Sequence, residues 1–155
     1  KEIEKRDYSF SWKIIKASDF NLPQHRARVY IVCFDKKSVL NYSDFVFPTP
    51  LPLTKTMSDI FAGKATRDIG FTLRCGGRGS PINDRRNWDG YMVDGLEKRL
   101  TSKEGKEMMG FPPSFVFPVS ETAAMKQLGN SVAVPVVRAI SQQIFKVLDD
   151  NHGNS

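Results

Sequence analysis

Two stretches of alternating apolar and polar residues open the chain. Phe10, Trp12 and Ile14 alternate with polar positions, which is the period of a half-buried strand. Turn residues occupy positions 19–23, and residues 28–34 then form a more continuous apolar run, typical of a strand covered on both faces. We therefore predict a β-hairpin whose second strand needs more sheet than the rest of the chain supplies.

Helical patterns appear in the last third of the chain. Thr101 and Glu104 have the spacing of a capping box, and Gly110 with the two prolines after it ends the helix that they begin. Ser120 is the N-cap of a second predicted helix, and Gly129 is its predicted C-terminal stop.

The last predicted helix runs from about residue 132 to 148, before a polar tail at 151–155. Apolar residues four positions apart form one stripe along it, which is typical of a helix that packs on one face. We expect this stripe to need a partner surface outside the chain. Its members are Val132, Val136, Ile140 and Ile144.

The middle of the chain follows neither period for long. Prolines among residues 48–52 predict an extended segment. A short helix is expected over 56–63, capped by Thr56 or Ser58. Residues 64–95 are rich in glycine, arginine, asparagine and aspartate, and predict short strands and loops.

Composition narrows the class of protein. The 155 residues suffice for one domain or two small lobes, and the net charge of +6 favours a polyanionic partner, although many basic proteins have none. Cys33, Cys75 and the two histidines form no zinc pattern, so we expect no metal. We predict two free thiols in a reducing cytoplasm, with Cys33 buried in its strand. We expect no membrane span, because no run of about 18 apolar residues occurs.

Arg26 and Arg28 stand two positions apart at the start of the apolar run, so they point to one face of an extended strand. Two guanidinium groups on one face repel each other unless an acceptor lies between them. A phosphate, a carboxylate or a carbonyl oxygen would serve. A solvated edge strand is the alternative.

Most of the positive charge lies between Lys64 and Arg86, where six cations face two carboxylates and five of the six are arginine. Arginine suits bidentate contact with guanine and phosphate, and the glycines among residues 76–79 let a backbone approach a ligand closely. Trp88 and Tyr91 are expected to form a small core rather than to stack on bases. The pattern predicts DNA or RNA contact, with a charged surface loop as the alternative. The candidate contacts are Arg74, Arg78, Ser80, Asn83, Arg85 and Arg86.

Gly129, Asn130 and Ser131 stand together before the last predicted helix. A helix N-terminus carries unpaired N–H groups and a partial positive charge. Ser131 can cap such a helix and still present its hydroxyl group to the carboxylate of a small ligand. A simple helix cap is the alternative.

Three segments, taken in this order, resemble the C-terminal half of the DNA (cytosine-5-)-methyltransferases. Residues 23–34, PQHRARVYIVCF, are similar to motif VIII with its Gln-x-Arg-x-Arg pattern. Residues 99–118, RLTSKEGKEMMGFPPSFVFP, are similar to motif IX, and residues 127–140, QLGNSVAVPVVRAI, to motif X. The family's variable target-recognition domain lies between motifs VIII and IX. The resemblance covers about residues 8–148.

The resemblance implies an α/β fold: the C-terminal part of a Rossmann-like S-adenosylmethionine-dependent methyltransferase domain, plus a small, mostly β and loop target-recognition lobe. Residues 1–46 would end the catalytic domain, and 47–118 would form the recognition domain, with residues 99–101 of motif IX organising it. Residues 119–150 would return to the catalytic domain, before a tail at 151–155.

The resemblance also implies roles for single residues. Asn130, Ser131 and Val132 would contact S-adenosylmethionine, with Ser131 near its methionine carboxylate. Arg28 would hold the flipped cytosine or the catalytic glutamate. Arg26 would sit close by, on the DNA backbone.

The chain departs from the family in its chemistry. The family's nucleophile is a cysteine directly after a proline, whereas Cys33 follows Val32 and Cys75 follows Arg74. The Glu-Asn-Val segment that supplies the acid, and the N-terminal glycine-rich segment, are absent, and the sequence does not begin with Met.

We therefore expect the recognition and C-terminal part of a DNA cytosine-5 methyltransferase of a bacterial restriction-modification system. It would methylate cytosine in a short specific duplex sequence, and it would be inactive without an N-terminal half or subunit that carries the nucleophile. A non-catalytic DNA-binding remnant, a regulatory subunit and part of an RNA cytosine methyltransferase are the alternatives. The preference of arginine for guanine suggests a short G·C-rich palindrome as the target.

Overall fold

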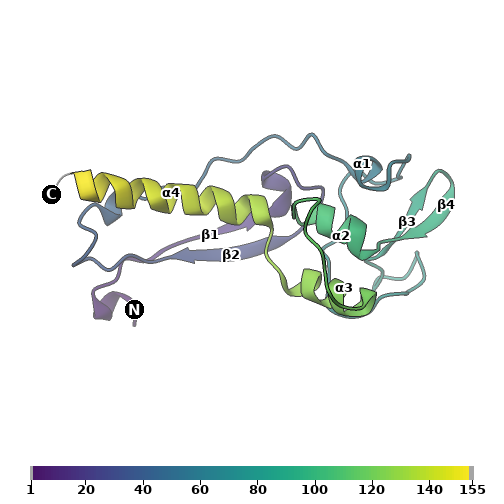
Figure 1. Ribbon diagram of the computed structural model, residues 1–155, viewed down its shortest axis with the longest axis horizontal. Coiled ribbons are helices and arrows are strands. Elements are labelled where there is room, and N and C mark those ends of the chain that lie inside the picture. Colours follow the sequence, from purple (N-terminus) through teal and green to yellow (C-terminus); the bar gives the residue numbers. More distant parts are fainter. Residues whose placement is uncertain (1, 154–155) are drawn as a thin grey trace.

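A computed structural model describes residues 2–153 and shows two lobes, each with its own buried hydrophobic cluster (Figure 1). The hairpin lobe contains β1 (Ser11–Lys16), β2 (Ala27–Val32) and α4 (Val134–Gly153), with short 3-10 turns at Glu4–Arg6, Ala17–Asp19 and Tyr42–Asp44. The loop lobe contains α1 (Met57–Phe61), β3 (Gly90–Val93), β4 (Leu96–Arg99), α2 (Ser102–Met108) and α3 (Glu121–Asn130).

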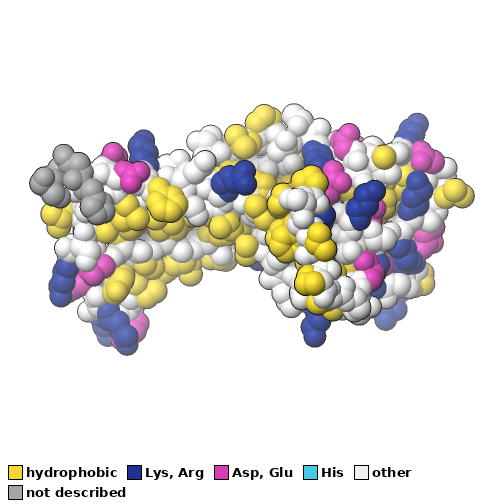
Figure 2. All heavy atoms as spheres, in the orientation of Figure 1, with side chains coloured by type: hydrophobic (Ala, Val, Ile, Leu, Met, Phe, Trp, Pro, Cys, Tyr) yellow, Lys and Arg dark blue, Asp and Glu magenta, His cyan; other side chains and the backbone are white. Residues whose placement is uncertain are grey.

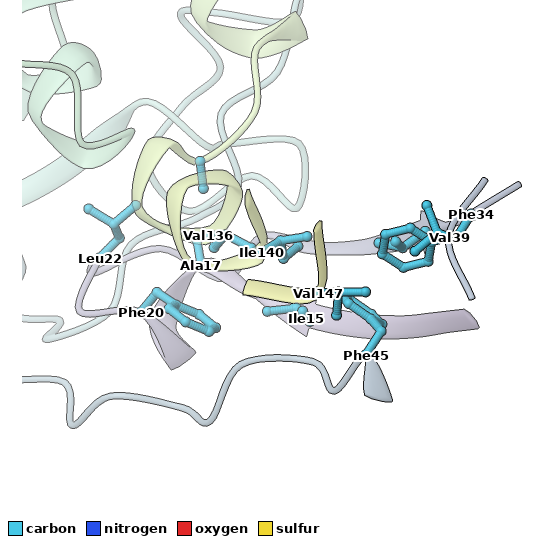
Figure 3. Packing of buried hydrophobic residues seen from close by; sticks show 12 residues of the cluster. Ile15, Ala17, Phe20, Leu22, Phe34, Val39, Phe45, Val136, Ile140 and Val147 are labelled. Atoms are coloured by element: carbon cyan, nitrogen blue, oxygen red, sulfur yellow. The ribbon is translucent and has the colours of Figure 1, made fainter. Parts of the chain in front are cut away.

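Helix α4 lies along one face of the antiparallel hairpin β1–β2. Figure 3 shows Ile15 of β1 close to Val136, Ile140 and Val147 of α4, and all four are buried. The predicted hairpin is confirmed, and most of the helical stripe is too. The stripe packs within this chain, so the expectation that it needs an outside surface is wrong. Val132 precedes α4 and is 50% exposed.

The other face of the hairpin is apolar and exposed. Trp12 pairs with Ile31 and Ile14 with Val29, and these four side chains are 55–59% exposed. Figure 2 shows hydrophobic side chains along this edge of the hairpin lobe. The half-buried pattern of β1 predicted the wrong face, because α4 covers the opposite one. The second strand is covered on one face only, and Cys33 beyond it is exposed rather than buried.

An extended segment, residues 46–56, carries the chain from the hairpin lobe to the loop lobe (Figure 1). Helix α1 follows, and Thr56 and Asp59 form its capping box. The predicted helix is confirmed, although its left-handed C-terminal residue is Ala62 with φ 48° rather than the expected glycine.

The loop lobe closes around its own core. Trp88, Tyr91, Met108 and Leu128 are at most 2% exposed, which confirms the expected core role of the two aromatic residues. Helix α3 contributes Leu128 to this cluster, whereas α4 belongs to the hairpin lobe. The structure therefore divides residues 119–150, which the sequence grouped together, between the two lobes.

Capping residues define α2 and α3 as predicted. Thr101 and Glu104 form the capping box of α2, and Gly110 follows that helix with φ 75°. The Ser120 hydroxyl accepts a hydrogen bond from the Ala123 amide at the start of α3. These local signals work because each helix end needs partners for its unpaired backbone groups.

The helical stretch at residues 121–151 is long and apolar enough to cross a membrane, by length and composition alone. In the structure it is interrupted between α3 and α4, at residues 131–133. Val136, Ile140 and Val147 lie buried against the hairpin, which is the position of a core helix.

Candidate functional site

Helix α3 continues past the predicted stop at Gly129 and ends at Asn130. Ser131 is its C-cap, and both its backbone amide, at 3.2 Å, and its hydroxyl group, at 2.8 Å, donate to the Leu128 carbonyl. The expected N-cap role of Ser131 is wrong, because α4 begins three residues later.

Gly129 brings α3 against the start of the loop of residues 73–86, which we call the arginine-rich loop. A Cβ atom at this position would lie 2.5 Å from the Arg74 carbonyl carbon and 2.7 Å from the Cys75 nitrogen. Backbone atoms cannot move aside as a flexible side chain can, so glycine is required here. The Cys75 thiol also donates to the Asn130 side-chain oxygen at 2.7 Å. Two segments that the sequence singled out separately are therefore in direct contact.

The three predicted cofactor residues line one groove. Its volume of about 540 Å³ lies in the range of small-molecule sites. The Ser131 hydroxyl donates its proton to the Leu128 carbonyl, so it can only accept a hydrogen bond from a ligand. The Asn130 side-chain oxygen accepts from Cys75, and its amide nitrogen can still donate to a ligand. The groove therefore offers polar groups beside an apolar wall. It is lined by Phe111, Asn130, Ser131, Val132, Val134, Val137 and Arg138.

Arg26 is enclosed and only 4% exposed. Its Nη1 donates to the Leu73 carbonyl at 3.1 Å, and its Nη2 donates to the carbonyls of Gly129 at 3.0 Å and Ser131 at 2.6 Å. Burial, and then the charge of Arg28, hold the pKa of Arg26 below its ordinary value. The sequence left a phosphate, a carboxylate or a carbonyl oxygen as the acceptor for this arginine pair. For Arg26 the acceptors are backbone carbonyl oxygens. In this position Arg26 holds backbone, instead of facing outward towards a DNA strand.

Arg28 differs from its neighbour. It is exposed, and its Nη1 donates to the carbonyl of the adjacent Ala27 at 2.7 Å. Its remaining guanidinium donors have no partner among residues 2–153. Arg28 is therefore the member of the pair that can receive an anionic or carbonyl ligand.

Gln24 belongs to the same junction, although it was not a sequence candidate. It is fully buried, its Oε1 accepts from the Leu73 amide at 3.0 Å, and its Nε2 donates to the Met108 carbonyl at 3.1 Å. Its place two residues before Arg26 in an extended segment was the available signal.

Two of the loop arginines are held by carboxylates. The Arg78 guanidinium lies 3.6 Å from Asp89 and 3.7 Å from Glu121. Arg86 pairs with Asp84 at 2.8 Å, and its hydrogen bonds lower the pKa of Asp84 to about 2. These contacts occupy the two arginines within the lobe.

The other loop candidates are available. Arg74, Arg85 and Asn83 are exposed, and their side chains form no hydrogen bond or ion pair within the described part of the chain. Ser80 is half-buried, and its hydroxyl donates to the Gly77 carbonyl at 3.4 Å. The structure thus leaves two arginines and one amide facing solvent on this loop.

Asp89 fixes the glycine-rich part of the loop from inside. Its carboxylate is 1% exposed, accepts from the Gly79 amide at 3.2 Å and pairs with Arg99 at 3.2 Å. Arg99 also donates to the Ser80 carbonyl at 3.1 Å. A buried carboxylate needs such partners, so this cluster sets the shape of the loop.

Comparison with known proteins decides the family. The sequence model of the C-5 cytosine-specific DNA methylase family matches residues 1–74 and 63–146. The chain belongs to the C-5 cytosine-specific DNA methylase family. This confirms the resemblance found in the sequence, and members of the family depend on S-adenosylmethionine.

Relatives of the chain within this family include type II methyltransferases. M1.ScrFI of Lactococcus lactis subsp. cremoris is 34% identical over 95% of this chain and 46% of its own length. M.DsaV of Dactylococcopsis salina is 36% identical over 95% of this chain and 50% of its own length. The chain therefore spans about half the length of the relatives that it matches.

Solved structures show the same fold. The chain superposes on Spodoptera frugiperda DNMT2 with a TM-score of 0.66 at 14% identity, over 93% of this chain and 60% of the other. It superposes on S. pombe Dnmt2 with a TM-score of 0.61 at 18% identity, over 96% of this chain and 60% of the other. The predicted α/β class, a partial Rossmann-like methyltransferase domain with a small second lobe, is confirmed.

Proposed function

We propose that the chain is the target-recognition and C-terminal part of a DNA cytosine-5 methyltransferase of a bacterial restriction-modification system. It would act on double-stranded DNA in the cytoplasm, with S-adenosylmethionine as cofactor. The observation that carries the proposal is the contact of Arg74 and Cys75 in the arginine-rich loop with the end of α3, where Gly129 precedes the groove residue Asn130. A methyltransferase needs its DNA-reading and cofactor-binding segments side by side.

The groove residues fit S-adenosylmethionine by their chemistry. The Asn130 amide nitrogen can donate to the methionine carboxylate, and the Ser131 oxygen can accept from the methionine ammonium group. This assignment moves the carboxylate from Ser131 to Asn130, because the Ser131 proton is already donated to Leu128. Val132 and Phe111 supply apolar wall. When bound, S-adenosylmethionine supplies the methyl group.

Arg28 is the candidate catalytic residue of this chain. In the family reaction the target cytosine is rotated out of the duplex into a pocket, and negative charge develops on its ring during attack. A free guanidinium group at the exocyclic oxygen would stabilise that charge. Arg26 would support the site by holding backbone carbonyls, at a distance from the base.

Exposed arginines would carry DNA binding. Arg74 and Arg85 can neutralise phosphates, and Asn83 can pair with a base edge. Arg78, Arg86 and Ser80 would shape the loop, since their side chains are already bonded within the lobe. Arginine-rich reading favours guanine, so we propose a short G·C-rich palindrome as the target.

The exposed face of the hairpin supports a partner that completes the enzyme. Trp12, Ile14, Val29 and Ile31 form a contiguous apolar surface, and such surfaces mark interfaces. We propose that it packs against the N-terminal catalytic half of the family, which carries the Pro-Cys nucleophile and the Glu-Asn-Val acid. The chain by itself would not transfer methyl groups.

The test measures labelled methyl transfer from S-adenosylmethionine to duplex DNA, with and without an added N-terminal half from the family. We expect transfer only in the mixture, and loss of it in the Arg28→Ala variant with little change in DNA affinity. Transfer by the chain alone would show that it needs no partner. DNA binding without transfer in any mixture would favour the non-catalytic remnant, and preferential binding of transfer RNA would favour an RNA enzyme.

A further inference from the structure

Three segments meet at the buried guanidinium group of Arg26. They are the residues just before β2, the start of the arginine-rich loop at Leu73, and the C-terminal end of α3 at Gly129 and Ser131. One guanidinium group holds carbonyls of the last two segments at 2.6 to 3.1 Å. Because both acceptor segments share one planar group, a shift of either one alters the hydrogen bonds of the other.

The loop end of this junction is hydrogen-bonded to the segment that carries Arg26. The Gly70 amide donates to the Pro23 carbonyl at 2.9 Å, and the His25 amide donates back to the Gly70 carbonyl at 3.0 Å. Gln24 holds the Leu73 amide at 3.0 Å, directly beside the Arg26 contact. The backbone that leads into Arg74 is therefore bonded along its length to the segment that carries Arg26.

The other end of this junction, at Gly129 and Asn130, is in direct contact with the same loop. The Gly129 position leaves no room for a Cβ beside Arg74, and Cys75 bonds to Asn130. Beyond Ser131 the chain is irregular until α4 begins at Val134. The groove residues Asn130 to Val132 thus lie between a fixed junction and a short connecting segment.

We propose that Arg26 is a positioning residue that couples DNA binding on the arginine-rich loop to the order of the cofactor segment, residues 130–133. The inference rests on the proposed function. DNA held at Arg74 further restrains the Leu73 carbonyl, Arg26 transmits this restraint to the Ser131 carbonyl, and residues 130–133 open less often. Coupling of this kind needs a contiguous network of packed and bonded groups, which the junction supplies.

Arginine is specifically suited to this role. Its two terminal nitrogens lie in one plane at a fixed separation, so they can reach Leu73 on one side and Ser131 on the other. A lysine ammonium group keeps the charge but places its donors at one point. Arg26→Lys should therefore keep the lobe folded and lose the bridge.

The experiment uses the full chain and a mixed-sequence duplex of about 25 base pairs at low salt, where phosphate contacts are strong. Anisotropy of labelled DNA reports affinity, and hydrogen exchange reports the protection of amides 130–133. We expect DNA to slow this exchange about fivefold, a typical coupling, in the natural chain and in Arg6→Lys. Arg6 is a matched control because it lies on the surface and, among the described residues, forms an ion pair with Glu2 alone, at 3.7 Å.

In Arg26→Lys we expect DNA affinity within about twofold and no slowing of exchange at residues 130–133. Equal slowing in Arg26→Lys and the natural chain overturns the coupling and leaves the proposed function standing. If the natural chain fails to bind DNA, the proposed function fails and the coupling fails with it. Should Arg26→Lys not fold, the natural chain decides by itself, because DNA that binds without slowing exchange at residues 130–133 overturns the coupling.

Discussion

The two lobes differ in how completely they bury their large apolar side chains. In the loop lobe, Trp88 and Tyr91 are enclosed and the buried Asp89 carboxylate has hydrogen-bonding partners. In the hairpin lobe, α4 covers one face of the sheet, and the other face leaves large apolar residues such as Trp12 and Ile14 more than half exposed. One lobe is a closed unit around its own core, and the other has a second apolar surface to cover.

This difference suits the lobes to different parts of the proposed function. A lobe that is complete in itself can present a shaped, charged loop to a polyanion, whichever protein surface lies behind it. A sheet with one uncovered apolar face is suited to join a larger sheet or layer. The Arg26 side chain lies where the hairpin, the arginine-rich loop and the end of α3 meet.

The sharpest test of the comparison uses adjacent residues on opposite faces of β1. Ile15 is 3% exposed under α4, whereas Ile14 is 57% exposed on the open face. Ile15→Ala should lower the free energy of unfolding by about 2–4 kcal/mol, because it leaves a cavity. Ile14→Ala should change it by less than about 0.5 kcal/mol. Urea unfolding of the two variants measures both values.

The same pair should reverse its order in binding to the N-terminal catalytic half. Ile14→Ala should weaken that association, measured by calorimetry, because it removes apolar area from the interface. An equal loss of stability from both substitutions would show that the open face is already covered in the chain by itself.

Alkaline pH probes the closed core of the loop lobe. Burial raises the pKa of Tyr91 to about 12. The unfolded chain loses this proton near pH 10, whereas the folded chain keeps it until about pH 12, so stability is fully present below pH 10 and falls as pH rises to 12. The expected loss is about 2–3 kcal/mol. Urea unfolding at pH 9 and 12 should show this fall, and Tyr91→Phe should lack that part of it.

The smallest expected effect is the difference in DNA binding between a variant of an unpaired loop arginine, Arg74, and a variant of a paired one, Arg86. Arg74→Ala should weaken duplex binding by about 1 kcal/mol and lower the slope of log affinity against log salt by about 1, the loss of one phosphate contact. Arg86→Ala should change both less, because Asp84 already neutralises Arg86. Anisotropy titrations at several salt concentrations measure both slopes, and equal slopes would mean that the Asp84 pair opens on DNA.

Local signals allowed much of the fold to be predicted from the sequence. The capping box at Thr101, the N-cap at Ser120 and the turn before β2 each depend on residues within a few positions. The predicted end of α3 at Gly129 was wrong. Gly129 is helical, and glycine is needed there because the Arg74 backbone leaves no room for a Cβ. That reason lies 55 positions away in the chain, at the contact between Cys75 and Asn130.

The candidate site divides in the same way. The sequence indicated that Arg26 and Arg28 share a face and that an acceptor would lie between them, yet it could not tell that Arg26 is enclosed and Arg28 exposed. It also could not show that Arg78 and Arg86 are paired while Arg74 and Arg85 are free, since loop side chains choose partners by distance in space.

By itself the sequence determined the helices, the hairpin, the basic loop and the family, because periodicity, caps and motifs are written in neighbouring residues. Tertiary structure alone decided which sheet face α4 covers, which helix Ser131 caps, and that loop and groove meet at Arg26. Those outcomes depend on close packing and on hydrogen bonds between residues distant in sequence, and no local pattern encodes them.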